Sequence, residues 1–203
     1  MRFFLLLFVL FLKLNSAEVI LSALVGQVTA EKKLSLGDKL EINQTYVVAP
    51  ESKIQLILNN TTILTISQNS LFSFKEINDK IIEISIEQGV YKIINLAHQD
   101  HRLTLFVDTS ELSMQMSDTI ALLNVTAFHT KAACVKSSFL IEHSSKEMTL
   151  KRNEMIDIDY KTVQKYPINF NDFHQVFIKK DYTVDMQNVL QESAKEDPSD
   201  LEN

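Results

Sequence analysis

Glycine is scarce in this 203-residue sequence, which has 3 glycines, 3 prolines, 1 cysteine and no tryptophan. Average usage would give about fourteen glycines in a chain of this length. Gly26, Gly37 and Gly89 cannot be assembled into the phosphate-binding patterns G-x-G-x-x-G or G-x-x-x-x-G-K. Glycine-built phosphate loops are therefore excluded, as are collagen-like and glycine-rich linker proteins.

The single cysteine, Cys134, excludes an intrachain disulfide and a multi-cysteine zinc site. Its small and apolar neighbours indicate a buried structural thiol, whereas a nucleophile would need an activating base nearby. The chain is 45% hydrophobic and 23% charged, which excludes wholesale disorder. Its length predicts one domain, or one domain with a tail.

The N-terminus has the layout of a secretory signal peptide. A basic start at Arg2 precedes ten apolar residues, Phe3 to Leu12, and a small-residue exit at Ala17. Ten apolar residues are too few to span a membrane, which takes about 20. We therefore expect a signal helix in residues 1–17, no stable membrane span after cleavage, and a periplasmic or secreted bacterial protein with a Sec-type signal. The alternative is an uncleaved anchor that continues through residues 19–25.

The charge balance bears on the partner class. Cleavage removes Arg2 and Lys13, which reduces the basic residues from 20 to 18 against 26 acidic residues. Nucleic acids and anionic membranes need clustered lysine and arginine. The sequence thus predicts no nucleic-acid partner and points to another envelope protein.

Alternation of apolar and polar residues dominates from about residue 50 to residue 160. Such period-two patterns predict strands with one face on a core. Asparagine, aspartate and serine stand between the runs, where they can satisfy turn backbones. The sequence thus predicts an all-β domain of many short strands over residues 18–166. The clearest alternating sets are Ile54, Leu56 and Leu58; Ile82, Ile84 and Ile86; Leu112, Met114 and Met116; and Ile156 and Ile158.

The pattern changes at Pro167. Residues 167–190 are predicted to form an apolar packing segment and a short helix that begins near residue 184. Residues 191–203 are acidic and are predicted to form a disordered tail.

The order of several short motifs resembles a known family. The motifs are Gly26-Gln-Val28, Leu34-Ser-Leu-Gly-Asp-Lys-Leu40, Thr45 to Ser52, Ile82 to Tyr91 and Leu150 to Ile156. Over about residues 22 to 160 the chain resembles the FecR-type domain of bacterial sigma-regulator proteins and of many secreted bacterial proteins. That resemblance implies a compact β-roll or a right-handed β-helix-like sandwich, with no catalytic residues and no cofactor. The cytoplasmic, transmembrane and terminal signalling modules of sigma regulators are not matched.

The glycines fall within this pattern, and we interpret them as structural turn positions together with Asp38. Gly37 is expected to need a positive φ. Gly89 is expected to join the strands 82–86 and 90–94 in a tight hairpin. Gly26 follows the first predicted strand.

Residues that could carry chemistry are few. His98 and His101 lie in a predicted turn and lack the further ligands and supporting contacts of a zinc site. Asp157 and Asp159 share a strand face, which we expect them to keep soluble. Asn43 lies in Glu41-Ile-Asn-Gln-Thr45, which resembles the acceptor of some bacterial glycosylation systems and is a possible glycosylation site. No metal, cofactor or catalytic residue is predicted.

Three functions are compared. The leading hypothesis is a non-enzymatic, exported FecR-like domain that acts through protein contacts at exposed sheet edges, in signalling or as a scaffold. The alternative is a periplasmic lipid or glycan carrier of the β-jellyroll type. The third class, an envelope hydrolase, lacks a recognisable motif. The groove of the carrier would be lined by Ile82, Ile84, Leu103, Leu105, Met114 and Met116.

Overall fold

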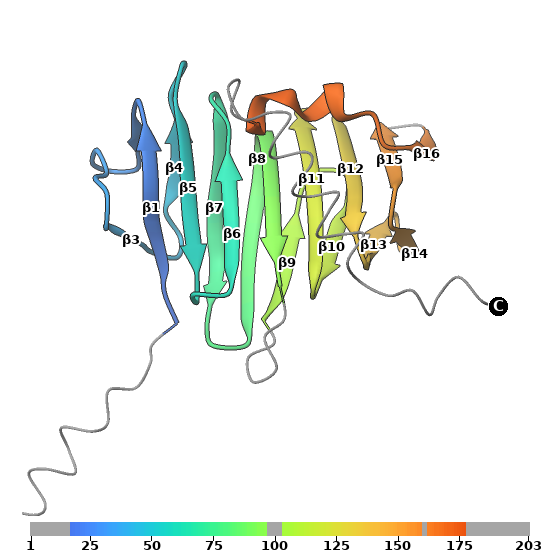
Figure 1. The fold of residues 1–203 in the computed structure, drawn as a ribbon, viewed down its shortest axis with the longest axis horizontal. Helices are drawn as coiled ribbons and strands as arrows, with labels where there is room; N and C mark the ends of the chain where they lie inside the picture. Colours follow the sequence, from blue (N-terminus) through green and yellow to red (C-terminus); the bar gives the residue numbers. More distant parts are fainter. Residues whose placement is uncertain (1–16, 97–102, 160–161, 178–203) are drawn as a thin grey trace, which may run out of the picture.

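The structure is a computed structural model that describes residues 17–96, 103–159 and 162–177. The described chain consists of strands and one short 3-10 helix, so the prediction of an all-β fold is confirmed (Figure 1). Among the described residues, none lies in a helix with the length and apolar character needed to cross a membrane. The predicted signal peptide, the predicted helix near residue 184 and the acidic tail lie outside the described residues.

The strands form two sheets that share one long strand, β8 (Ile81–Asn95). Sheet A has the order β3-β1-β5-β6-β8-β11-β12-β15-β16, and sheet B has the order β2-β4-β7-β8-β9-β10-β13-β14. All ladders are antiparallel except that of β8 with β9. Antiparallel pairing matches a roll or sandwich, because a β-helix stacks parallel strands. Sheet A contains β1 (Val19–Val25), β3 (Lys39–Leu40), β5 (Lys53–Leu58), β6 (Thr62–Ile66), β11 (Thr119–Thr126), β12 (His129–Lys136), β15 (Glu154–Asp159) and β16 (Val163–Pro167). Sheet B contains β2 (Val28–Thr29), β4 (Thr45–Val48), β7 (Ser70–Ile77), β9 (Thr104–Asp108), β10 (Ser113–Met116), β13 (Ser138–His143) and β14 (Lys146–Lys151).

Gly89 does not form the predicted hairpin, and that prediction is wrong. It lies inside β8, with Leu71 of β7 opposite Gln88 and Val125 of β11 opposite Gly89. The first half of β8 therefore belongs to sheet B and the second half to sheet A. Gly89 has a φ of +126°, which lets the strand cross between the sheets. Even-numbered residues up to Ile86 point into the core, and odd-numbered residues from Tyr91 onward do so. In the sequence, this shift in the alternation resembles a turn.

Asparagine and serine take the turn positions that glycine would normally occupy, as predicted. Ten described residues other than glycine have positive φ, and five of them are asparagines. The two-residue turn between β13 and β14 uses Ser144 and Ser145, both with positive φ, which matches the right-handed twist of a hairpin. The scarcity of glycine is thus offset by residues that tolerate this backbone region.

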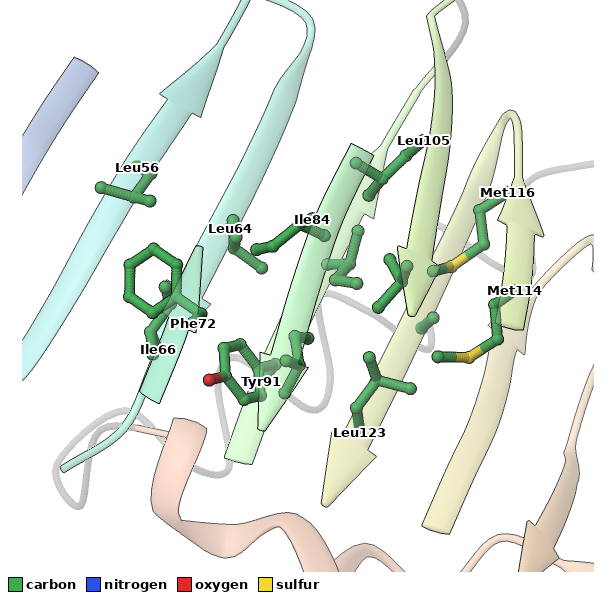
Figure 2. Close-up of a cluster of buried hydrophobic side chains, with 14 of the residues drawn as sticks. Leu56, Leu64, Ile66, Phe72, Ile84, Tyr91, Leu105, Met114, Met116 and Leu123 are labelled. Atoms are coloured by element: carbon green, nitrogen blue, oxygen red, sulfur yellow. The ribbon is translucent and has the colours of Figure 1, made fainter. Parts of the chain in front are cut away.

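The inner faces of both sheets enclose the main hydrophobic core (Figure 2). Aromatic rings lie at its centre, where Phe72 stacks on Tyr46 with ring centroids 5.3 Å apart and meets Tyr91 edge to face. The predicted alternation is borne out in β5, whose residues are alternately half-buried and buried. The core is therefore formed by the side chains that the period-two pattern selects.

A second apolar cluster lies on the outer face of sheet A. The 3-10 helix η1 (Phe170–Val176) lies across the strand ends there and contacts β8 and β11 (Figure 1). Phe173 and Val176 bury themselves against Leu122 and Met155. Apolar residues after Pro167 were expected to pack on the sheet, and in the structure they cover this outer face.

Candidate functional site

The predicted turn residues have structural roles. In the turn 35–38, the backbone N–H of Ser35 donates to Oδ2 of Asp38 at 2.9 Å, and Gly37 has a φ of +85°. Gly26 lies against Ser52, whose Oγ would be 2.2 Å from a Cβ at position 26. These contacts explain why a side chain is excluded at Gly26 and why Asp38 follows Gly37.

The residues of the hypothetical carrier groove are plain core. All six are at most 3% exposed and belong to the cluster between the sheets. Met114 and Met116 pack inward with the other core side chains in Figure 2. The side chains of these residues form part of the packed core of the described structure.

The remaining sequence candidates are dispersed. His98 and His101 lie outside the described residues. Within the described ranges, no group of three or more histidine, cysteine, aspartate or glutamate side chains could hold a metal ion. Asn43 is exposed in a turn with a φ of +61°, and its use as a glycosylation acceptor stays a prediction.

A polar network on the outer face of sheet A is the densest cluster of titratable groups near η1. Asp157 on β15 contacts the ring of His129 and accepts a hydrogen bond from the Tyr166 hydroxyl. The Lys131 ammonium lies 3.1 Å from Oδ1 of Asp172 on η1 and 3.8 Å from Oδ2 of Asp157. The network therefore connects β12, β15 and β16 with η1, and Asp157 does more than keep the surface soluble.

The chemistry of this network favours a structural role. A histidine–aspartate pair can also act as a general base on water, so the structural role rests on the contacts of Asp157 with Tyr166 and of Lys131 with Asp172 of η1. Burial, reinforced by Asp157, raises the pKa of Tyr166, so its hydroxyl stays protonated and donates. Cys134 points into the inner core, and burial raises the pKa of its thiol to about 12. The network fixes η1 to the sheet through the ion pair of Lys131 and Asp172.

Side chains cap two outward backbone groups of β14, the edge strand of sheet B. The Lys165 ammonium donates to the carbonyl of Thr149 at 3.1 Å, and the backbone N–H of Lys151 donates to Oε2 of Glu154 at 2.7 Å. Lys165 and Glu154 also pair with each other at 2.6 Å. This capping occupies the carbonyl of Thr149 and the N–H of Lys151, which hinders the addition of another strand at these two positions.

The edge of sheet A at β16 differs from this, because only one side of its backbone is hydrogen-bonded within the described chain. Thr162 accepts from the N–H of Asp159 at 3.1 Å, and the N–H of Ile168 donates to Asn153 at 3.3 Å. In an antiparallel ladder, alternate residues turn their backbone groups toward the neighbouring strand. The even-numbered residues of this segment therefore face β15, and the odd-numbered residues face away.

β16 consequently presents free backbone groups at Val163 and Lys165. Within the described part of the chain, no residue bonds their outward N–H and C=O groups. Pro167 has no N–H and ends the open segment. The Val163 residue is 44% exposed. The opposite edges of the two sheets are strands of two residues each, β2 and β3. β14 has two capped backbone groups, so β16 is the longest edge strand described without a capped outward group.

The chain shares its fold with solved structures. Two crystal structures, at 1.65 and 2.50 Å resolution, of a "putative anti-sigma factor" from Parabacteroides distasonis each match with a TM-score of 0.54 and 12% identity. Each match covers 62% of this chain and 60% of the solved chain. At this identity the likeness establishes the fold. No family model matches the sequence, and no curated protein matches it.

Sequence reasoning missed both the network and the asymmetry of the edges. The alternation in β15 and the exposure of Asp157 were readable, but its partners come from β12 and β16. Lys165 gives no sequence signal for its role, because Thr149 lies on the other sheet. The change of pattern at Pro167 was readable, but it did not identify β16 as an edge strand.

Proposed function

We propose that this chain is a non-enzymatic FecR-like domain protein of the bacterial envelope that acts by contacting another envelope protein. The motif order over residues 22 to 160 and the fold shared with the anti-sigma factor structures support this proposal. Residues 1–17 serve as the export signal in this proposal, and the domain then lies in the periplasm or outside the cell.

The open edge of β16 is the observation that carries the contact function. Exposed edges are recurrent sites of strand addition, in which main-chain hydrogen bonds supply affinity. Proteins normally blunt such edges with charged side chains and proline, and on β14 Lys165 and Glu154 cap two backbone groups. β16 itself carries Lys165 and Pro167, yet within the described chain no residue bonds the outward N–H and C=O groups of Val163 and Lys165, which supports a role in binding.

The other functions find less support in the side chains. The residues of the carrier groove are occupied in the core, and the polar network holds η1. Protein contact, in signalling or as a scaffold, needs only an exposed surface, and the edge of sheet A at β16 is one.

Expression of a C-terminally tagged chain in its native host tests this function. We expect an intact mass that begins near Glu18, recovery in the envelope fraction, and a specific protein crosslinked to the chain. The matched control lacks residues 2–17 and should recover no such protein. A full-length mass in the cytoplasm, or a lipid mass in place of a crosslinked protein, would refute the proposal.

A further inference from the structure

The charges along β16 disfavour a second copy of this chain as the partner of the open edge. In antiparallel self-pairing, an outward residue must pair with an outward residue. Pairing centred on Lys165 would place the two Lys165 side chains directly opposite each other. Directly opposed like charges destabilise a strand pair. Pairing centred on Gln164 would place the Lys165 ammonium of each copy opposite the apolar Val163 of the other copy.

Lys165 has room for one more acceptor. An ammonium has three donors, and two of these bind Oε2 of Glu154 and the carbonyl of Thr149. The Lys165 side chain is 42% exposed. A lysine with two carboxylate partners already occurs on sheet B. There the ammonium of Lys75 lies 2.7 Å from Oδ2 of Asp108 and 3.2 Å from Oε1 of Glu83.

Val163 and Lys165 lie on the same side of sheet A, two residues apart. This spacing corresponds to about 6.8 Å along an antiparallel strand. Val163 is opposite Ile158 and Lys165 is opposite Ile156, and both of these residues face the inner core. An added strand would therefore meet an apolar position and a cationic position at the spacing of its own alternate side chains.

We propose that β16 takes up an extended segment of a partner protein that carries an acidic residue opposite Lys165 and an apolar residue opposite Val163. The outward N–H and C=O groups of these two residues would form the main-chain bonds, and Pro167 limits the register at one end. This inference rests on the proposed contact function and specifies its surface and the chemistry of its partner.

The test uses the exported protein, labelled with ¹⁵N, and threonine-rich peptides of about nine residues. One pair of peptides carries glutamate and valine two residues apart, in either order, and a control pair carries lysine in place of glutamate. We expect a glutamate peptide to slow hydrogen exchange at the Val163 and Lys165 amides by about tenfold at saturation. The lysine peptides should bind at least about fivefold more weakly.

Variants separate edge pairing from loss of folding. Val163→Pro removes an outward N–H without removing a ladder bond and should abolish binding. Thr149→Pro makes the same change at an outward position of the edge strand β14 and should bind normally. Lys165→Glu should reverse the preference in favour of the lysine peptides.

Three results would overturn the inference. The first is that millimolar peptide does not slow hydrogen exchange at the two amides. The second is equal affinity for the glutamate and lysine peptides. The third is a dimer in sedimentation that the Val163→Pro substitution converts to monomer. A crosslinked envelope protein that persists in Val163→Pro would leave the proposed function standing and remove β16 as its surface.

Discussion

Substitution of Gly89 by alanine should destabilise the protein strongly, because two separate costs coincide at this residue. Its φ of +126° lies in a region that side chains rarely adopt. A Cβ built on Gly89 would lie 2.0 Å from Oγ, 2.6 Å from Cβ and 2.9 Å from Cα of Ser70. The Ser70 hydroxyl is itself held at 2.7 Å by the carbonyl of Ser67.

The magnitude follows from these two costs. A strained backbone conformation costs about 1–3 kcal/mol, and overpacking of a close-packed site adds about 1–3 kcal/mol. The sum of about 2–6 kcal/mol is a large part of the usual stability of about 5–15 kcal/mol. In a domain of this size it lowers the melting temperature by about 4–24 °C.

Gly37 supplies the matched control. Its φ of +85° is also positive, but no atom lies within 4 Å of a Cβ built there. Gly37→Ala should therefore show only the backbone cost. Urea and thermal unfolding of both variants measure the difference, and Ser70→Gly combined with Gly89→Ala should recover part of the loss. Equal destabilisation at Gly89 and Gly37 would refute the packing argument.

Three further outcomes are expected. Cys134, whose thiol pKa burial raises to about 12, should resist alkylation at pH 8 until denaturant is added; labelling of the native protein would contradict its burial. The hydrogen bond from Lys165, and then that from the Lys151 N–H, lowers the pKa of Glu154. The stabilisation of the folded state by ionised Glu154 is therefore present above the unfolded pKa of about 4.3 and is lost as the pH falls through the folded pKa. Glu154→Gln should flatten the acid limb of a stability–pH curve, and an unchanged limb would show that the pair does not contribute. Phe173→Ala should cost about 3–5 kcal/mol in urea unfolding, against a change within about 0.5 kcal/mol for Phe128→Ala, whose residue is 78% exposed; similar values would mean that η1 does not cover the outer face of sheet A.

Much of the fold was readable from local patterns. The alternation of Ile54, Leu56 and Leu58 identifies buried faces because side chains of a strand alternate by geometry. The asparagines identify turns because their side chains tolerate positive φ, as at Asn59 and Asn69. Both signals depend on neighbouring residues only, so a sequence displays them without its tertiary partners.

The passage of β8 through Gly89 was not readable, because its cause lies in other strands. A change in the phase of alternation looks alike in a hairpin and in a strand that moves between sheets. Pairing with β7 on one side and β11 on the other distinguishes the two cases. The role of Asp157 likewise depended on His129 and Tyr166, which reach it from two other strands.

The sequence by itself determined that this protein is built from short strands, with few glycines and with asparagine and serine at its turns. It also showed that the alternating pattern ends at Pro167. Only the tertiary structure decided which edge is open. The side chains of Lys165 and Glu154 lie on sheet A and cap β14 of sheet B, because the two sheets bring their last strands together. The same packing leaves the outward backbone of β16 unpaired, since within the described chain no further strand lies beyond it.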